Sequence, residues 1–397
     1  MKPRVLVATT YYHPVVGGVE THARQLVRHL VRRGFTVQVV TKRVSAADPA
    51  QQTIDGAAVH RVPPAGERSS QGKWLAAPFF FSTALALRST FDVIVCIDYR
   101  GIGVGSVAAA RLLGRPVIVQ AGTAGVLAPP GPDSGVPNES ELEQLGKTIP
   151  RAVYRAADQF VCISRDIERE ALLAGIPRAR VHYLPHGVDL DRFRPAAPEE
   201  RGAIRRQRGW PVDTLVVLFV GRLSVEKGVL DLLEAWRILA RMDALLAVVG
   251  PDMPEHPWDA GHTARTFVTR HGLGESVRFE GVAEDTSPFY RAADVFVQPS
   301  HFEAFGISAI EAMASGVAVV ASRVGGLQDF LTHDVNGLLH EPRNPESLAG
   351  AIREALDSAA LRNRLASAAL QAATTLFDER VLLDRYADLI ESTVGTR

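Results

Sequence analysis

The chain has 397 residues, of which 46% are hydrophobic and 22% charged, a composition typical of a globular protein long enough for two domains. Lys plus Arg and Asp plus Glu both total 44, so the net charge does not favour a nucleic-acid-binding protein. There is no run of 18 apolar residues and no secretory signal pattern, so we expect neither a membrane-spanning nor an exported protein.

The first half of the chain alternates short apolar runs with helical patterns, the clearest of which covers 19–33. The two cysteines, Cys96 and Cys162, lie in such apolar runs and read as reduced, buried residues of a cytoplasmic protein. Continuous apolar strands that alternate with helices indicate a parallel sheet covered on both faces. The predicted strands are 5–8, 37–41, 93–97, 117–120, 160–163 and 181–184.

The alternation starts again after a stretch rich in Pro, Arg and Glu at 191–213. We therefore expect two doubly wound α/β domains, in which ligands bind beyond the carboxyl ends of the strands. The predicted strands of the second half are 215–220, 245–249, 277–279, 295–298 and 317–322, and its helices include 229–240 and 348–356. An amphipathic segment at 378–392 is expected to pack back on the first domain.

The stretch from His301 to Gly316, HFEAFGISAIEAMASG, is the most informative part of the chain. It reads as a polar turn with Glu303, followed by a helix that starts near Gly306, carries Glu311 and stops at Gly316. The start of a helix beside glycine offers free N–H groups and a positive dipole end to a phosphate. A phosphate-binding helix start flanked by two acids that can accept hydrogen bonds from hydroxyls is typical of a nucleotide-sugar site. The alternative is that Glu303 is an ordinary loop carboxylate and Glu311 an exposed helix residue.

Three other glycine-containing turns follow predicted strands. Gly17 and Gly18 precede the first helix, where bare amides suit an anion, with a ligand-free tight turn as the alternative. In GRLSVEKG, Arg222 and Lys227 follow Gly221, and two cations there would neutralise a pyrophosphate unless the turn is only a solvated basic one. The third turn, SRVGGLQDF, is a phosphate loop or a simple surface turn.

These motifs together resemble those of retaining family 4 glycosyltransferases. The segments that carry the resemblance, in the family's order, are GGVE, VHYLPHGVDLDRF, GRLSVEKG, HFEAFGISAIEAMASG and SRVGGLQDFLTHDVNGLL. The resemblance implies the GT-B fold, two Rossmann-like doubly wound domains that face each other across a cleft. The expected boundaries are an acceptor-side domain at 1–195, a linker at 196–213, a nucleotide-sugar-binding domain at 214–375 and a C-terminal helix at 376–397.

The resemblance also implies roles for individual residues. Arg222 and Lys227, after Gly221, would hold the donor diphosphate, and Glu303 would contact the hydroxyls of the transferred sugar. Glu311 would bind the ribose. Backbone amides that meet phosphate and sugar would come from Phe305, Gly306 and Ile307, and from the loop of Gly17 and Gly18. No metal and no cofactor is expected beyond the nucleotide diphosphate sugar, because cations and helix dipoles of the protein would replace a divalent ion.

The chain departs from the family at two positions. Many relatives carry a His-Gly pair where this sequence has Ala121-Gly122, and Gln120 or Thr123 would supply the polar contacts to sugar or acceptor instead. At the second position, His186 stands where Asn is more usual, and we interpret it as structural.

The expected function is retaining transfer of a hexosyl-type group to an acceptor hydroxyl in cell-envelope glycan, polysaccharide or glycolipid synthesis. The acceptor would be a glycan or a lipid-linked molecule. The basic first helix and the apolar run 74–81 are consistent with peripheral contact at an anionic inner membrane face, or with ordinary packing. The alternatives are a catalytically silent GT-B subunit, and a nicotinamide-dependent oxidoreductase suggested only by the Rossmann-like alternation. GIGVGS at 101–106 superficially resembles a dinucleotide-binding motif but lacks its final spacing.

Overall fold

The structure is a computed structural model with two compact units. The first unit holds the described residues up to His186 and those from Arg380 onward, and the second runs from Gly187 to Glu379. The structure describes residues 2–15, 17–66, 70–97, 101–123, 125, 127, 148–240, 243–254 and 256–395, without the side chains of 70–73 and 148–150.

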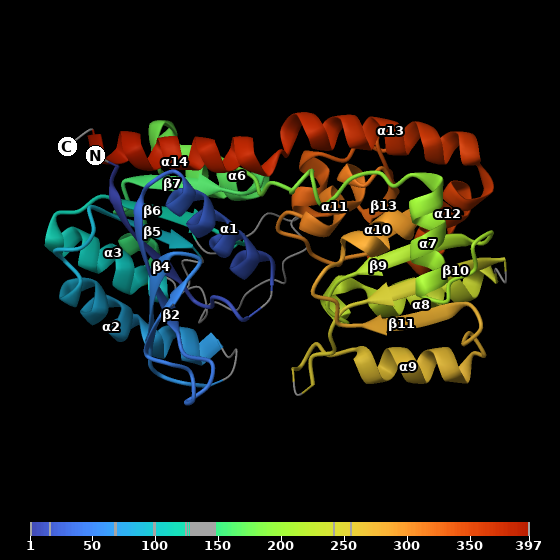
Figure 1. Cartoon of the computed structure of the whole chain (residues 1–397), viewed down its shortest axis with the longest axis horizontal. Helices are drawn as coiled ribbons and strands as arrows, with labels where there is room; N and C mark the ends of the chain where they lie inside the picture. Colours follow the sequence, from blue (N-terminus) through green and yellow to red (C-terminus); the bar gives the residue numbers. More distant parts are fainter. Residues whose placement is uncertain are drawn as a thin grey trace. The chain divides into compact units, whose positions relative to one another are not determined.

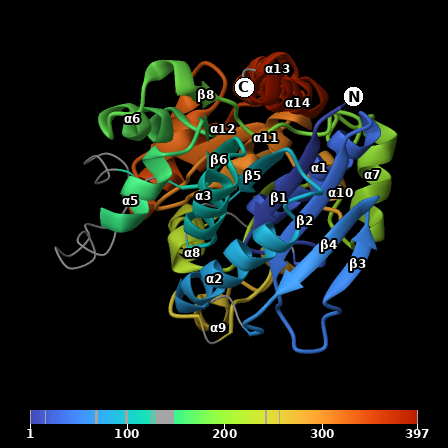
Figure 2. The same cartoon turned by 90° about the vertical axis from the view of Figure 1, so that its left-hand side faces the viewer.

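The first unit is built on one long sheet (Figures 1 and 2). Its strands lie in the order β3-β4-β2-β1-β5-β6-β7-β8, and the paired strands are parallel except for the antiparallel pair β3 and β4. The strand bounds are β1 Arg4–Thr9, β2 Thr36–Lys42, β3 Gln51–Ile54, β4 Ala57–Val62, β5 Val93–Ile97, β6 Val117–Ala121, β7 Gln159–Cys162 and β8 Val181–Tyr183.

Helices cover both faces of this sheet, as the apolar runs predicted. Residues of α1 and α14 share one core with β1, β2, β4 and β5, while α2 packs on α3 and α3 on α5. The helix bounds are α1 Gly18–Arg32, α2 Ser70–Ala86, α3 Ile102–Leu113, α5 Thr148–Arg155, α6 Arg165–Leu173, the 3-10 turn η2 Arg178–Arg180 and α14 Glu379–Gly395.

The second unit has a smaller sheet in which the paired strands are parallel. The strand order is β11-β10-β9-β12-β13-β14. The chain adds β10 and β11 on one side of β9 and then returns to add β12, β13 and β14 on its other side, so the order reverses between β9 and β12. Such a reversal point is where doubly wound sheets bind ligands. The strand bounds are β9 Leu215–Val220, β10 Ala244–Val249, β11 Val277–Gly281, β12 Val295–Gln298, β13 Ala318–Ser322 and β14 Leu338–His340.

The core of the second unit surrounds Trp236, whose side chain is 1% exposed. Residues of α8, α9 and α12 pack there on one face of the sheet, while α10, α11 and α13 contact one another or the sheet elsewhere. The helix bounds are α7 Pro198–Gln207, η3 Val225–Lys227, α8 Val229–Leu239, α9 Gly261–Arg270, α10 Ser287–Ala292, α11 Ile307–Ala314, η4 Gly325–Asp329, α12 Pro345–Asp357 and α13 Ala359–Leu376.

The segment 196–213, which the sequence suggests as a linker, contains helix α7 and belongs to the second unit. Arg205 of α7 is 4% exposed, and its Nη2 donates to Oδ2 of Asp294 at 2.7 Å. Arg201 pairs with the same carboxylate. Composition alone suggested a loop here, because in the sequence Arg201 and Arg205 cannot be distinguished from arginines exposed to solvent.

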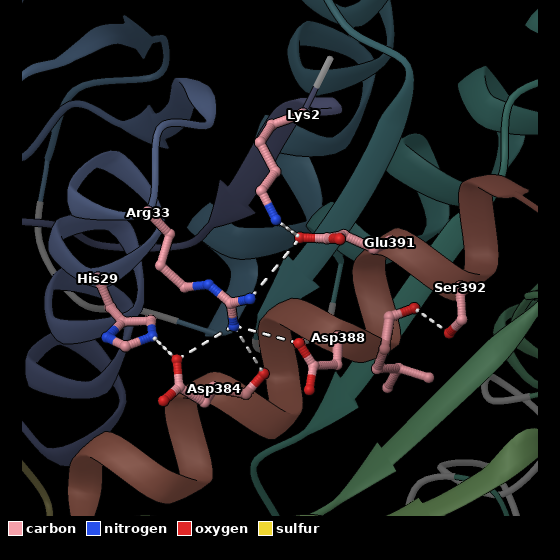
Figure 3. Close-up of polar contacts among 8 residues, drawn as sticks. Lys2, His29, Arg33, Asp384, Asp388, Glu391 and Ser392 are labelled. Atoms are coloured by element: carbon pink, nitrogen blue, oxygen red, sulfur yellow. Dashed lines mark hydrogen bonds and ion pairs between the residues drawn. The ribbon is translucent and has the colours of Figure 1, made fainter.

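Helix α14 is held in the first unit by ion pairs as well as by apolar contacts (Figure 3). Arg33 Nη1 lies 3.1 Å from carboxylate oxygens of both Asp384 and Asp388, and His29 Nε2 lies 2.9 Å from Asp384. Lys2 pairs with Glu391. Part of the basic face of α1 therefore binds α14, which supports the packing interpretation of these cations over a membrane role.

The apolar run 74–81 lies on α2 and is only half buried. Ala76 and Phe80 are buried, whereas Trp74, Leu75 and Phe79 are 45%, 63% and 41% exposed. In the neighbouring helix α3, a Cβ on Gly105 would lie 2.3 Å from the Ala77 carbonyl oxygen. Gly105, from the GIGVGS stretch, thus serves the close packing of two helices.

Candidate active site

The loops that follow β9 and β12 approach each other closely in the second unit. Gly228, with φ of 70°, lies so near the Pro299 carbonyl that a Cβ would stand 1.9 Å from its oxygen. Only glycine fits such a contact at positive φ. The backbone N–H of His301 also donates to the Glu226 carbonyl at 2.8 Å. The adjacency of β9 and β12 thus brings Lys227 to Glu303.

Glu303 receives three side-chain hydrogen bonds on one oxygen. Lys227 Nζ donates to Oε2 at 2.8 Å, Gln298 Nε2 at 2.5 Å and Ser300 Oγ at 3.3 Å. The residue is 9% exposed, so its charge is balanced by a cation and by neutral donors in a shielded site. A carboxylate held in this way keeps its other oxygen, Oε1, in a fixed orientation, where it can accept a hydrogen bond from a hydroxyl group.

The glycine pair at 325–326 supports this carboxylate from the loop after β13. The N–H of Gly326 donates to the Glu303 carbonyl at 3.0 Å. A Cβ on Gly325, whose φ is 44°, would lie 2.1 Å from the same oxygen. The motif SRVGGLQDF is therefore a close approach between two loops, which corrects the interpretation of a simple surface turn.

Helix α11 starts at Gly306, whose φ of 106° is a left-handed conformation that favours glycine. The N–H groups of Ala309 and Ile310 donate to the Gly306 carbonyl, so those of Ile307 and Ser308 are the ones at this helix start that can serve an anion. Phe305, one residue earlier, is 2% exposed and packs against Phe330 and Phe377. Its side chain is part of the core, so only its backbone is left for a ligand.

Glu311 lies one turn into α11 and is half buried. The Tyr290 hydroxyl donates to its Oε2 at 2.8 Å. Burial raises the pKa of the Glu311 carboxyl to about 7, although the hydrogen bond from Tyr290 acts in the opposite direction. The carboxyl is thus poised between its neutral and ionised forms near neutral pH.

Arg222 stands apart from this network. Its guanidinium pairs with Glu226, four residues further on, and its side chain is 42% exposed. It follows Gly221 at the end of β9, as the sequence predicts. The structure therefore joins Lys227 to Glu303 and leaves Arg222 in a neighbouring exposed pair.

The predicted residues of the first unit lie at the ends of β1 and β6. Gly17 is extended, and a Cβ there would lie 2.3 Å from Oε2 of Glu20, so a carboxylate of the first turn of α1 lies against Gly17. Gln120 is 2% exposed and its Oε1 lies 3.2 Å from His22 Nε2. Thr123 is half buried just beyond β6.

A buried histidine cluster is among the features that sequence reasoning missed. The rings of His22 and His186 have centroids 4.2 Å apart, and burial lowers the pKa of His22 to about 4. This burial agrees with the structural role expected of His186. His22 could have been found from its spacing on the apolar face of α1. Gln298, Ser300 and Tyr290 carried no local signal.

No group of three or more His, Cys, Asp or Glu side chains in the described part of the chain is arranged to hold a metal ion. No helix there is both long and apolar enough to cross a membrane.

Two parallel sheets with helices on both faces, one of them carrying a Lys–Glu pair at its reversal point, define a GT-B protein with two Rossmann-like domains. The chain matches the family model "Glycosyltransferase Family 4" over residues 16–192 and "Glycosyl transferases group 1" over residues 200–372. It belongs to this family and is a glycosyltransferase.

Individual relatives agree with this assignment over almost their whole length. The chain is 31% identical to D-inositol 3-phosphate glycosyltransferase 1 of Catenulispora acidiphila, with 96% of this chain and 92% of the relative covered. Sucrose-phosphate synthase from Thermosynechococcus elongatus superposes with a TM-score of 0.85 at 24% identity, with both chains fully covered (100%). Anabaena HepE, solved in complex with UDP-glucose, gives a TM-score of 0.77 at 21% identity, with 98% of this chain and 100% of HepE covered.

Proposed function

We propose that the protein transfers a hexosyl-type group from a nucleotide diphosphate sugar to an acceptor hydroxyl with retention of the anomeric configuration. The observation that carries this proposal is the Lys227–Glu303 pair, 2.8 Å long, in the loops beyond β9 and β12 and close to the start of α11. A cation, a shielded carboxylate and a helix start are the groups that a sugar diphosphate requires.

The donor would bind along the carboxyl edge of the second sheet. Lys227 and Arg222 would neutralise the diphosphate, with amides at Gly306 and Ile307 on a phosphate oxygen. Glu303 would accept hydrogen bonds from hydroxyls of the sugar, and Glu311 from those of the ribose. The presence of UDP-glucose in a fold relative supports this class of donor.

The reaction would need no metal ion. The bond between the anomeric carbon and the diphosphate oxygen breaks, and its electron pair leaves with the diphosphate that Lys227 and Arg222 stabilise. The acceptor oxygen attacks the same face of the sugar, and its proton passes to the departing phosphate. Stabilising the leaving group in this way is where most of the catalytic effect would arise.

The acceptor would be met by the first unit, with Thr123 as a contact, whereas the Gly17-Gly18 loop would serve the donor phosphate. Gln120 would act through its backbone or after movement, because its side chain is only 2% exposed. The name of the Catenulispora relative specifies a phosphorylated polyol. A glycan or lipid-linked acceptor at the inner membrane face is the alternative, and exposed Trp74, Leu75 and Phe79 favour it.

A donor screen tests this proposal. The purified protein is incubated with UDP-, GDP- and ADP-linked hexoses, with and without EDTA, and released nucleoside diphosphate is measured. We expect slow hydrolysis of one donor and no loss of rate in EDTA. Binding of a nucleotide sugar without any release, alone or with acceptor mixtures, would favour the silent-subunit alternative. NMR of the product's anomeric proton checks retention.

A further inference from the structure

A cluster of arginines lies between α1 and β4 in the first unit, beside the loop that follows β1. Arg24 and Arg28 of α1 both pair with Asp55, with nitrogen–oxygen distances of 2.6 and 3.0 Å. Arg61 of β4 points to the same face, because it lies two and four positions after the core residues Val59 and Ala57, which pack with α1. Figure 2 shows α1, β1, β2 and β4 side by side.

His13 connects these residues. Arg24 Nη1 lies 3.1 Å from His13 Nδ1, which leaves the Nε2 nitrogen to carry the proton. Arg61 Nη2 donates to the His13 carbonyl at 2.9 Å. Burial, with the nearby arginines Arg24, Arg28 and Arg61, lowers the pKa of His13, while Asp55 opposes this effect.

The positive charge of this cluster is not balanced. Asp55 is shared by two arginines, whereas Arg61 makes no ion pair with a carboxylate within the described chain. Asp48 is close enough to sense its charge but does not pair with it. A cluster with three guanidinium groups and one paired carboxylate keeps an excess of positive charge.

Two buried donors in this cluster lack a hydrogen-bond partner among the described residues. Arg61 is 7% exposed, and its Nη1 has no acceptor. The Tyr12 hydroxyl, on a side chain that is 3% exposed, has none either. Buried donors in folded proteins are nearly always paired, and a buried guanidinium without an anion is costly. An oxyanion bound here would supply the acceptors that Arg61 Nη1 and the Tyr12 hydroxyl lack among the described residues.

We propose that His13, Arg24 and Arg61 form a subsite for a phosphate group carried by the acceptor. A phosphate offers several oxygens to a guanidinium fork and to an imidazole N–H at once. Solvent reaches the cluster, because Pro14 is exposed and the Arg24 side chain is 31% exposed. The assignment of the phosphate to an acceptor rests on the proposed function, whereas binding of the anion itself does not.

Direct binding of inorganic phosphate tests the subsite without any measurement of activity. The His13 ring signals, assigned by their loss in His13→Asn, are followed by NMR in the full chain. We expect a saturable shift with phosphate and a rise in the pKa of His13. Arg24→Gln should weaken binding at least tenfold, whereas Arg32→Gln, which removes an exposed charge from the same helix, should leave it unchanged. An unresponsive wild type, or equal losses in the two variants, would overturn the proposal.

Two further arms separate a bound phosphate from other causes. Glucose 6-phosphate should produce the same shifts as inorganic phosphate and compete with it, and glucose should produce none; equal effects of the two sugars would contradict phosphate recognition.

Phosphate should raise the melting temperature of the wild type but not of Arg61→Met, and an equal rise in both would remove Arg61 from the site. A chain that binds phosphate but releases no nucleotide from any donor keeps the subsite and refutes only the proposed function.

Discussion

The charged groups beyond the strands of the two units differ in how completely they are paired. In the second unit, Glu303 is surrounded by Lys227, Gln298 and Ser300, so the charge is balanced inside the protein. In the first unit, Arg61 and Tyr12 keep buried donors that have no acceptor among the described residues. The difference teaches that the Glu303 site of the second unit is organised without a ligand, whereas the arginine cluster of the first unit lacks an anion.

The balanced site also constrains how a donor can bind. In the proposed site, a diphosphate bound at Lys227 would share this cation with Glu303, whose Oε2 accepts a hydrogen bond from the same Nζ. Removal of one member of such a pair leaves the other buried and uncompensated. The largest predicted effect therefore concerns Lys227.

Lys227→Ala should lower kcat/KM for the donor about 10²- to 10³-fold, since a charged donor to the leaving group is worth ~2–4 kcal/mol. Release of nucleoside diphosphate measures the effect, and circular dichroism verifies that the variant folds. Arg237→Ala is the matched control, because its cation pairs with Glu234 on the exposed side of α8. Wild-type turnover by a folded Lys227→Ala protein would remove the central residue of the proposed donor site.

Gly325→Ala tests whether the Glu303 network depends on the close approach of the β13 loop. A Cβ would stand 2.1 Å from the Glu303 carbonyl oxygen at a φ of 44°. The strain should lower the free energy of unfolding by about 1–3 kcal/mol. Chemical denaturation measures it. Gly274→Ala, where a Cβ meets no atom within 4 Å, should change stability by less than about 0.5 kcal/mol. Equal stability of the two variants would contradict the described geometry.

Glu311→Gln sharpens the comparison through pH. The pKa of Glu311 is raised from 4.5 to about 7 in the folded protein, so the folded state binds this proton more tightly than the unfolded state. The resulting contribution to the free energy of unfolding is fully present below pH 4.5 and is lost as the pH rises through 7. The variant should therefore gain stability relative to the wild type over this window, by about 1–2 kcal/mol after allowance for solvent. Denaturation curves at pH 4.5, 6 and 8 measure the difference. A difference that stays constant with pH would show that Glu311 titrates normally.

Arg33→Gln should have the smallest effect. It removes the exposed ion pairs with Asp384 and Asp388 that hold α14 (Figure 3), worth about 0.5–1 kcal/mol in total. Because salt screens such pairs, the loss should nearly disappear at about 1 M NaCl. Denaturation at low and high salt checks this, and a loss that is independent of salt would point to packing instead.

Most strands could be predicted because burial on both faces leaves a local mark, a continuous apolar run such as Val93–Ile97 or Leu215–Val220. Strands β3, β4 and β14 were missed. β3 carries polar residues at the sheet edge, β4 mixes Arg and His with its apolar residues, and β14 has only three residues. Helix α7 was missed because its anchoring arginines resemble solvated ones.

The sequence by itself determined the two α/β sheets, the glycine turns after their strands and the identity of the charged residues in those turns, since each is set by neighbours in the chain. Only the tertiary structure decided which of these residues meet. Lys227 and Glu303 are 76 positions apart and pair because β12 lies beside β9 in the sheet. Arg61 meets His13 through the packing of α1 and β4. Such contacts depend on strand order and loop approach, which no local pattern of residues encodes.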